Sequence, residues 1–355
     1  MLSPVRWENS RLKLLDQTLL PAEERVLSLS RAEEVAEAIR RLAVRGAPAL
    51  GVAAAYGVVL GVRDASSVEE LAQRFDEAYE LLQSTRPTAV NLRWALERQR
   101  RLLERDLLRG LPPREIADAL LEEAHRIRRE DVEANRRLGE HGAELLPPGA
   151  RVLTHCNAGA LATAGYGTAL GVVRAAWAQG KLKKVWVDET RPLLQGARLT
   201  AWELQKEGIP YEIVVDGAAG ALMARGLVDA VITGADRVAA NGDVANKIGT
   251  YPLAVLAHRH GIPFYAALPT STIDPEIPHG GAIPIEERDP EEVFTVLGRR
   301  VAPQGASARN YAFDVTPHEL VTALITEVGV LRPPFADSIP EALSRPEAVY
   351  RHGQP

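Results

Sequence analysis

The chain has 355 residues but only one cysteine, Cys156. A single cysteine cannot form a disulfide bond within the chain, so the sequence does not indicate an oxidising compartment. Basic residues are not in excess either, because the formal net charge is −5 and the isoelectric point is about 6.0. Surfaces that bind nucleic acids usually carry a basic excess. We therefore expect no internal disulfide and no nucleic-acid partner.

Signals for secretion or membrane insertion are also weak. Charged residues interrupt any signal-peptide core near the N-terminus: Arg6, Glu8, Arg11, Lys13 and Asp16. The ranges 46–62 and 152–173 lack charged side chains, but both are rich in Gly and Ala. We interpret them as closely packed interior segments rather than membrane spans. The expected location is the cytoplasm.

Motifs for common cofactors are missing as well. The glycine-rich stretch after Cys156 does not match the dinucleotide-binding pattern with its acidic residue about 20 positions later, nor the phosphate-binding loop of nucleotide hydrolases. No group of His and Cys residues has the spacing of a zinc site. Dinucleotide and ATP binding therefore lose support, and the spacing does not indicate a zinc site.

The pattern along the chain predicts two domains. Residues 1–29 resemble three short strands, and the following residues to about 146 are mostly helical, including an all-apolar helix over about 47–62. The run Pro147-Pro148-Gly149 predicts a boundary. The predicted parts are a smaller, mainly helical N-terminal domain with a short β prelude over 1–147, a second domain over 148–332, and a Pro-rich tail over 333–355.

Strand and helix patterns alternate in the second domain. Strands are predicted at 151–156, 184–188, 211–215, 229–234, 263–268 and about 311–315. Helices are predicted near 163–180, 194–207, 217–226, 249–261 and 316–328. Such alternation predicts an α/β fold, in which helices cover both faces of a doubly wound, Rossmann-like parallel sheet.

Polar residues gather where these predicted strands end. The carboxyl ends of parallel strands meet at one edge of a sheet, where α/β proteins bind ligands. The residues at those ends include His155, Cys156, Asn157, Asp188, Glu189, Thr190, Arg191, Gln195, Asp216, Asp236, Asn241, Asn246, Lys247 and Asp274. A sheet with only a structural role does not need so many polar residues at its strand ends. We therefore take this edge as the candidate site.

Two of these residues are candidates for catalysis. Cys156 ends a predicted strand before a glycine loop whose N–H groups would stabilise a thiolate; the alternative is an inert buried cysteine. Asp236 ends an apolar strand, where partly dry surroundings would raise its pKa and make it a usable acid or base. The alternative for Asp236 is a helix cap or a partner of Arg237.

Three cationic residues are candidates for binding an anion. Lys247 is suited to a phosphate or an enolate oxygen, or else is a solvated surface lysine. Arg45 and Arg86 each precede a predicted helix start, where an arginine and free N–H groups can share one phosphate. The alternative is that both arginines only cap helices or pair with acids.

Five stretches together resemble a known family. They begin at Arg45 (Arg-Gly-Ala-Pro-Ala-Leu-Gly), Arg86 (Arg-Pro-Thr-Ala-Val-Asn-Leu), Thr154 (Thr-His-Cys-Asn-Ala-Gly-Ala-Leu-Ala-Thr), Glu189 (Glu-Thr-Arg-Pro-Leu-Leu-Gln-Gly-Ala-Arg-Leu-Thr-Ala-Trp-Glu-Leu) and Gly234 (Gly-Ala-Asp-Arg-Val, continuing to Asn-Lys-Ile-Gly-Thr-Tyr). The chain resembles bacterial methylthioribose-1-phosphate isomerases. Their larger family includes ribose-1,5-bisphosphate isomerases and the α, β and δ subunits of the eukaryotic translation-initiation guanine-exchange factor.

The resemblance implies a homodimeric isomerase of methionine salvage that needs no metal or nucleotide. It implies that Cys156 and Asp236 are the catalytic pair. The residues implied to bind substrate are Arg45, Gly46, Ala47, Arg86, Gln195, Asn246 and Lys247. Two alternatives stay open: an isomerase of ribose 1,5-bisphosphate, and a regulatory subunit that binds a nucleotide or sugar phosphate without turnover.

Overall fold

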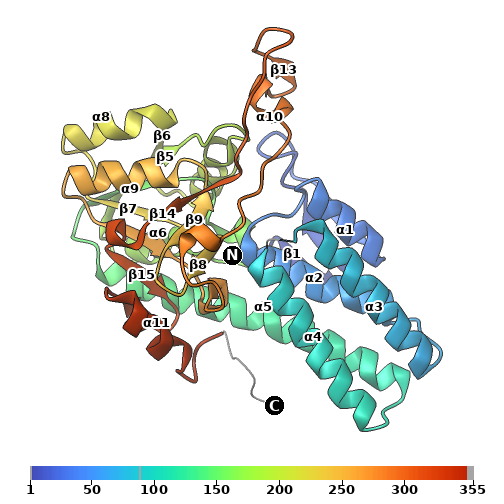
Figure 1. The fold of residues 1–355 in the computed structure, drawn as a ribbon. Helices are drawn as coiled ribbons and strands as arrows, with labels where there is room; N and C mark the ends of the chain where they lie inside the picture. The colour runs from blue at the N-terminus through green and yellow to red at the C-terminus, as the bar shows by residue number, and fades with distance from the viewer. Residues whose placement is uncertain (1, 88, 350–355) are drawn as a thin grey trace. The chain divides into compact units, whose positions relative to one another are not determined.

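A computed structural model describes residues 2–87 and 89–349 of the chain, which divide by packing into two compact units (Figure 1). Unit 1 runs to Asn135 and includes the separate segment Ala160–Gly167. Unit 2 comprises Arg136–Gly159 and the chain from Thr168 onward. The predicted boundary after residue 147 follows the end of a long helix, whereas the division by packing falls inside that helix.

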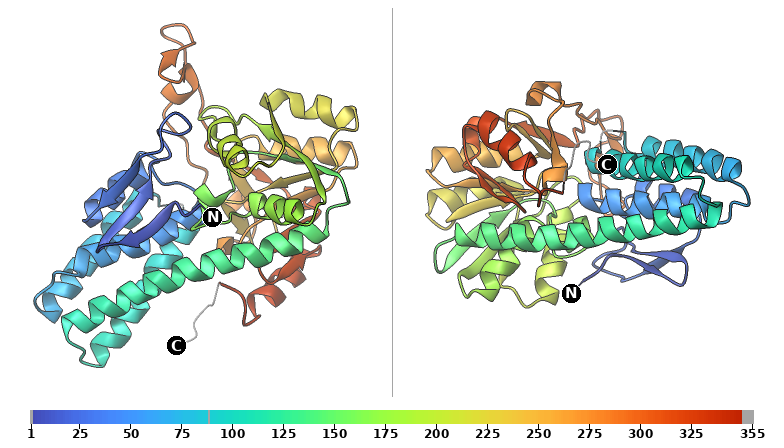
Figure 2. Two further views of the ribbon diagram at one scale, coloured as in Figure 1. Left: turned by 180° about the vertical axis from the view of Figure 1, so that it is seen from behind. Right: turned by 90° about the horizontal axis from the view of Figure 1, so that it is seen from below.

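Unit 1 consists of a small antiparallel sheet and a set of helices. The sheet has the order β1-β2-β3, with β1 (Val5–Glu8), β2 (Arg11–Leu15) and β3 (Val26–Leu29). The helices are α1 (Ala32–Arg40), α2 (Ala47–Val62), α3 (Val68–Thr85), α4 (Val90–Leu108) and the first part of α5 (Pro113–Glu144), with the short turn η1 (Ala160–Ala162). Figure 2 shows α5 as one unbroken helix. The predicted β prelude and helical region are both present.

The centre of unit 1 is α2. Its sequence is almost entirely Ala, Val, Leu and Gly, and nearly all of its residues are buried. Gly51 lets α2 approach α4 closely, since a Cβ there would lie 2.7 Å from the carbonyl oxygen of Asn91. Tyr56 of α2 stacks on Trp7 of β1, with ring centroids 5.4 Å apart. The uncharged range 46–62 is therefore a packed interior helix, and no helix in the described ranges is long and apolar enough to cross a membrane.

Unit 2 is built on a seven-stranded sheet with the order β16-β15-β10-β7-β4-β5-β6. Its strands are β4 (Ala150–Thr154), β5 (Leu182–Asp188), β6 (Tyr211–Val214), β7 (Ala230–Thr233), β10 (Phe264–Ala267), β15 (Ala323–Thr326) and β16 (Gly329–Leu331). Every pair is parallel except β15 with β16. The predicted doubly wound parallel sheet is confirmed.

Helices cover both faces of this sheet, and successive strand residues alternate between two cores. Val152 and Val185 pack with the end of α5, with α6 (Ala169–Ala178) and with α7 (Ala201–Lys206). Leu153 and Trp186 belong to the opposite core, with α8 (Ala219–Ala224), α9 (Thr250–Arg259) and α11 (Phe335–Leu343). This alternation is the period-two geometry of a strand buried on both sides.

Two predictions at the C-terminal end are wrong. The range 316–328 is not a helix, because it contains the turn η6 (His318–Leu320) and the central strand β15. Its run Val321-Thr-Ala-Leu-Ile-Thr is rich in β-branched residues, which favour a strand buried between neighbours. The strand predicted near 311–315 exists as β14 (Phe313–Thr316) but belongs to another sheet.

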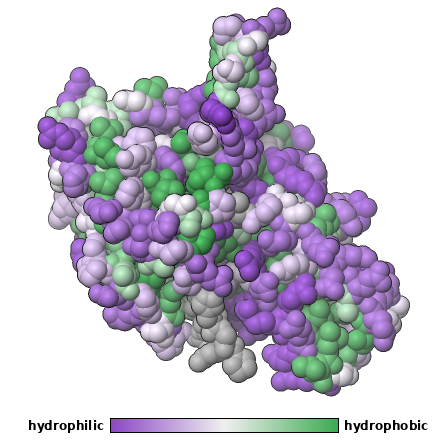
Figure 3. Space-filling model, viewed as in Figure 1, coloured by the Kyte–Doolittle hydropathy of each residue, from purple (hydrophilic) through white to green (hydrophobic). Residues whose placement is uncertain are grey.

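That second sheet has the order β11-β8-β9-β14 and includes a hairpin of two short strands. Its other strands are β8 (Arg237–Ala239), β9 (Val244–Lys247) and β11 (Ile273–Asp274). An arm with α10 (Glu291–Phe294), β12 (Thr295–Val296) and β13 (Arg299–Arg300) extends from unit 2 (Figure 1). Both hydrophilic and hydrophobic residues are visible on its surface in Figure 3. Leu297 at its tip is 83% exposed.

The predicted Pro-rich tail contributes to the core of unit 2. Its residues Phe335 and Ile339 lie on α11 and are each 1% exposed. Residues 350–355 of the tail lie outside the described part of the chain.

Candidate functional site

The sheet of unit 2 changes winding direction between β4 and β7. From β4 the chain proceeds outward through β5 to β6, then returns to add β7 on the other side of β4. Doubly wound folds bind ligands at such a switch point, beyond the carboxyl ends of the strands. Cys156 follows β4 and Asp236 follows β7. The two segments are in contact, because a Cβ at Gly234 would lie 2.8 Å from the Cβ of Ala158.

Cys156 is buried and has an unusual main-chain conformation. Cys156 follows the end of β4, is 8% exposed, and has a φ of +60°. The Cys156 N–H donates to Oγ1 of Thr190 at 2.8 Å, and the Cys156 carbonyl accepts from Oγ1 of Thr200 at 2.6 Å. A non-glycine residue with positive φ is strained by about 1–3 kcal/mol and persists only where its surroundings fix it.

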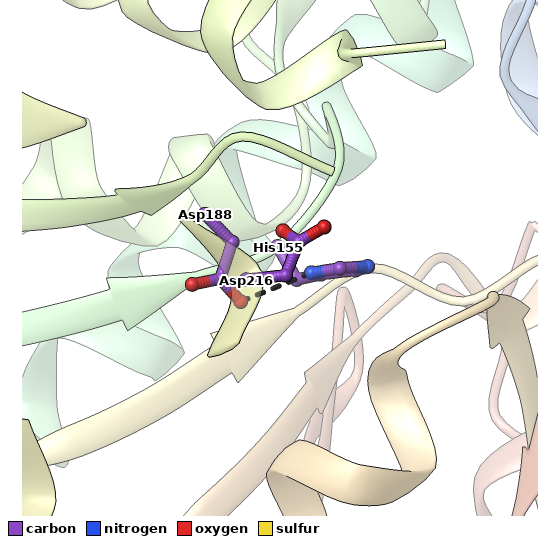
Figure 4. A group of neighbouring side chains, drawn as sticks. All are labelled: His155, Asp188 and Asp216. Carbon is purple, nitrogen blue, oxygen red and sulfur yellow. Dashed lines mark hydrogen bonds and ion pairs between the residues drawn. The ribbon is translucent and has the colours of Figure 1, made fainter. Parts of the chain in front are cut away.

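A buried pair of His155 and Asp188 lies beside this segment (Figure 4). Nδ1 of His155 is 3.1 Å from Oδ2 of Asp188, and Nε2 donates to the carbonyl of Ile248 at 2.8 Å. Since both ring nitrogens face oxygen atoms, the arrangement fits an imidazolium beside a carboxylate. Gly249 allows the main chain to approach the imidazole ring of His155 closely, because a Cβ at this position would lie 2.8 Å from Cε1 of His155.

Burial and pairing shift both pKa values upward. Burial lowers the pKa of His155, but the hydrogen bond and charge of Asp188 and the Ile248 carbonyl outweigh it, so the net pKa is raised. Burial raises the pKa of Asp188 to about 6, against the opposing effect of His155. The pairing therefore favours a protonated imidazole at His155, while burial favours a proton on Asp188.

Asp216 completes the group drawn in Figure 4. Its two carboxylate oxygens accept the N–H groups of Thr190 and Arg191, at 2.7 and 2.8 Å. His155, Asp188 and Asp216 each offer a possible metal ligand, and these atoms lie within 4.8 Å of one another. However, both nitrogens of His155 and both oxygens of Asp216 already form hydrogen bonds, which a metal would have to replace. We therefore interpret His155, Asp188 and Asp216 as a hydrogen-bond network.

A second buried network fixes the residue after the cysteine. The amide of Asn157 donates to Oγ1 of Thr200 at 3.2 Å and to Oε1 of Glu203 at 2.9 Å. Glu203 is 1% exposed and pairs with Arg174 at 2.7 Å. Gly159 leaves room for this carboxylate, because a Cβ there would lie 2.4 Å from it.

Gln195 carries a buried acceptor with no partner in the described ranges. It follows β5 and is 5% exposed, and its Oε1 forms no hydrogen bond with the residues described. It immediately precedes η2 (Gly196–Thr200), a π-helical turn of the kind often found at functional sites. An unsatisfied buried acceptor costs about 1–3 kcal/mol, so a ligand hydroxyl at this position would be stabilising.

The hairpin β8–β9 carries the remaining candidates of unit 2. The N–H of Asp236 donates to the carbonyl of Ala245 at 2.9 Å, which ties Asp236 to the strand that holds Asn246 and Lys247. Asn246 is buried, and its amide donates to Oγ1 of Thr250 at 3.0 Å. Nζ of Lys247 lies 4.8 Å from the ring centre of Phe313.

The other candidates belong to unit 1. Arg45, Gly46 and Ala47 form the start of α2, where Gly46 is the cap residue with φ +94° and no side chain caps the helix. Gly46 also meets the turn η1, because a Cβ there would lie 2.5 Å from Ala162. Arg86 is the cap residue at the end of α3. Arg45 therefore stands beside a helix start, whose free N–H groups suit an anion, whereas Arg86 supplies a cation between the end of α3 and the start of α4.

The structure therefore brings together Cys156, Gln195, Asp236, Asn246 and Lys247 at one edge of unit 2, and it places Arg45, Gly46, Ala47 and Arg86 in unit 1. Sequence reasoning missed three residues that support this edge, namely Arg174, Thr200 and Glu203. Thr200 and Glu203 lie in the stretch from Glu189 that carries the family resemblance, and Arg174 lies outside it. The sequence alone gives none of them a role, because their importance arises from contacts with residues far along the chain.

Comparison with known proteins places the chain among characterised relatives. A model of the initiation factor 2 subunit family matches residues 43–333. A methylthioribose-1-phosphate isomerase of Desulforudis audaxviator (strain MP104C) is 58% identical over 338 residues, covering 95% of this chain and 96% of that protein.

Two solved structures are similar over nearly the whole chain. The 5-methylthioribose 1-phosphate isomerase of Pyrococcus horikoshii OT3 has a TM-score of 0.90 and 50% identity, covering 96% of each chain. A structure described as translation initiation factor eIF-2B, subunit delta, from A. fulgidus has a TM-score of 0.84 and 48% identity, covering 96% of this chain and 99% of that one.

Proposed function

This chain belongs to the initiation factor 2 subunit family, within its methylthioribose-1-phosphate isomerases, and we propose that it converts 5-methylthioribose 1-phosphate to 5-methylthioribulose 1-phosphate in methionine salvage. The observation that carries the proposal is the delivery of Cys156 and Asp236 to the switch point by neighbouring strands, in a chain 58% identical to a named isomerase. We further propose that the working form is a cytoplasmic homodimer.

The reaction needs one hydrogen to move from C2 to C1 of the sugar. The substrate carries its phosphate on C1, so it has no free aldehyde, and the bond between C1 and the ring oxygen must break while the phosphate stays on C1. Opening the ring adds a proton to the ring oxygen, and forming the ketone removes the proton of the C2 hydroxyl. Asp236 handles the C2 hydroxyl proton and assists ring opening. Cys156 lies across the C1–C2 bond, as a base or as a group that stabilises the transition state.

The remaining candidates bind the substrate. Gln195 would accept a sugar hydroxyl at its unpaired Oε1, while Asn246 and Lys247 contact the sugar and its charge. Arg45 and Arg86, with the backbone of Gly46 and Ala47, bind the phosphate at the start of α2.

A product assay with two sugars tests the substrate. The purified protein is incubated with 5-methylthioribose 1-phosphate or with ribose 1,5-bisphosphate, and the ketose is detected by NMR. We expect rapid turnover of the methylthio sugar and at least about 100-fold lower kcat/KM for the bisphosphate. The reason is that the second phosphate of the bisphosphate would have to occupy the site of the apolar methylthio group. Preferred turnover of the bisphosphate would reject the proposed substrate.

Substrate deuterated at C2 separates two routes for the hydrogen. Transfer as a proton through an enolate allows exchange with solvent, whereas a hydride shift keeps the label on C1. Complete loss of label to solvent would rule out the hydride shift. Complete retention at C1 would weaken the enolate route.

A second candidate is a regulatory subunit that binds a sugar phosphate or nucleotide without turnover. It is favoured by the 48% identity with the structure described as an initiation factor subunit. The two candidates differ in one result: tight binding of the methylthio sugar without any ketose product would support the regulatory role.

A further inference from the structure

Two buried threonine hydroxyls hold opposite ends of the Cys156 main chain. Oγ1 of Thr190 accepts the Cys156 N–H, and Oγ1 of Thr200 donates to the Cys156 carbonyl, at 2.8 and 2.6 Å. Both threonines are 0% exposed. The peptide groups on the two sides of this cysteine are therefore fixed by side chains from other segments.

Each hydroxyl has a second partner that sets its direction. Oγ1 of Thr190 donates to the carbonyl of Asp188 at 3.1 Å, so its proton points away from Cys156 and a lone pair faces the Cys156 N–H. Oγ1 of Thr200 accepts from the amide of Asn157 at 3.2 Å, so its proton is available to the Cys156 carbonyl. Donors and acceptors match throughout, which makes the arrangement a fixed network rather than a chance contact.

The two threonines stand on segments that are themselves constrained. Thr190 has φ +66° and its N–H is held by Asp216, while Thr200 ends the π-helical turn η2. Gly196 begins that turn at a close approach, since a Cβ there would lie 1.7 Å from the carbonyl oxygen of Asp188. Strained backbone therefore recurs on both sides of the cysteine, as at sites where geometry is preset for function.

We propose that Thr190 and Thr200 are positioning residues, which hold Cys156 in its left-handed conformation and so direct its thiol toward the reacting sugar. The assignment rests on the proposed function for its catalytic meaning. Neither threonine needs to touch the substrate. Their effect is on where the sulfur lies, and a displacement of about 1 Å from a reacting centre can lower a rate about 100-fold.

The test compares variants that remove the hydroxyl with variants that keep it. Thr190→Val and Thr200→Val keep the branched shape without the hydrogen bonds, while Thr190→Ser and Thr200→Ser keep the hydroxyl. Thr326→Val is the matched control, because Thr326 is also 0% exposed and its hydroxyl donates to a main-chain carbonyl, that of Gly329, at 2.8 Å.

Two readouts are measured for every variant. The first is kcat and KM with 5-methylthioribose 1-phosphate. The second is the rate of alkylation by iodoacetamide across pH, which reports Cys156 alone because the chain has one cysteine. The alkylation rate needs no substrate, so it tests the positioning network even if the proposed reaction is wrong.

The valine variants should lower kcat by about 10- to 100-fold, with KM within about twofold of wild type. Their alkylation should be at least about threefold faster, because a loosened segment opens more often. The serine variants and Thr326→Val should stay near wild type in both readouts. Wild-type alkylation profiles in both valine variants would overturn the positioning role, whereas altered alkylation in a protein without turnover would reject only the proposed function.

Should the valine variants not fold, the strain itself is measured at Cys156. Glycine adopts positive φ without a Cβ penalty, so Cys156→Gly should melt about 2 °C or more above Cys156→Ala. An equal or lower melting temperature for the glycine variant would show that the left-handed conformation at residue 156 is not strained. That result would overturn the proposal.

Discussion

The two units carry their candidate residues in different ways. In unit 2, Cys156 and Asn157 belong to buried hydrogen-bond networks at the end of a central strand, and their partners come from distant segments. In unit 1, Arg45 precedes the start of the almost entirely apolar α2, and Arg86 is the cap residue at the end of α3.

This difference suggests a division of labour. Buried networks fix atoms to within fractions of an ångström, which is the requirement of bond-making chemistry. Both arginines supply positive charge, and the start of α2 beside Arg45 adds free N–H groups, which is the requirement of phosphate binding. We therefore expect changes at Cys156 and Asp236 to act mainly on kcat and changes at the arginines to act mainly on KM.

Removing the catalytic candidates should give the largest effect. Cys156→Ala and Asp236→Asn should each lower kcat by about 10³-fold, because each removes a group that acts on the reacting atoms. Steady-state kinetics measures the loss. Asp229→Asn is the control, since Asp229 pairs with Arg151 before β7 begins, and its kcat should stay within about twofold of wild type. Unchanged kcat in either Cys156→Ala or Asp236→Asn would remove that residue from the mechanism.

Replacing the arginines should give the next largest effect. Arg45→Met and Arg86→Met should each raise KM by about 10- to 100-fold with little change in stability, because each loses a charge-assisted hydrogen bond of about 1.5–3 kcal/mol. Arg100→Met is the control: this arginine lies over the ring of Tyr79 at 4.2 Å, also in unit 1. Normal KM in both Arg45 and Arg86 variants would reject the proposed phosphate site.

Gln195→Met should separate binding from folding. Its Oε1 is buried without a partner in the described ranges, so its loss should leave the free energy of unfolding unchanged or raise it by about 1 kcal/mol. KM should rise by about fivefold. Gln99→Met is the contrasting variant, because that amide donates to the carbonyl of Leu120 at 3.1 Å and its loss should lower stability but leave KM unchanged. A less stable Gln195 variant with normal KM would assign the amide to packing.

The smallest effect is expected in the pH dependence of stability. In the folded protein the pKa of Asp188 is about 6, above its ordinary 3.8, and that of His155 is raised above 6.5. The folded state therefore binds more protons than the unfolded state, so this stabilisation is present at low pH and is lost as pH rises through the folded values.

Denaturant unfolding from pH 4 to 9 should show that trend as a difference between proteins. The reference is the paired variant His155→Gln with Asp188→Asn, which titrates at neither position. The stability of the wild type relative to this reference should fall as pH rises. A difference that grows with pH would mean that the pair is held in another protonation state.

Much of this architecture follows from the sequence alone. The apolar strands and the Gly and Pro breaks predicted β4, β5, β7 and β10, and the polar residues after them predicted the edge that holds the candidates of unit 2. The predictions of the fold class, the family and an isomerase are confirmed. The roles of Cys156 and Asp236 stay predictions.

Other features depend on tertiary contacts that no local pattern encodes. Strand β15 was predicted as a helix because its short apolar run has no clear period, and only pairing with β10 and β16 decides its form. The π-helical turn that carries Thr200 lies in a range predicted as an ordinary helix. The pairing of His155 with Asp188 joins residues whose separation in sequence gives no signal.

Binding of 5-methylthioribose 1-phosphate to variants, measured by calorimetry, tests the division of labour most directly. Cys156→Ala should bind the sugar within about threefold of the wild-type substrate affinity while forming ketose about 10³-fold more slowly, and Arg45→Met should bind at least about tenfold more weakly. The opposite pattern, with binding lost in Cys156→Ala and retained in Arg45→Met, would contradict the account.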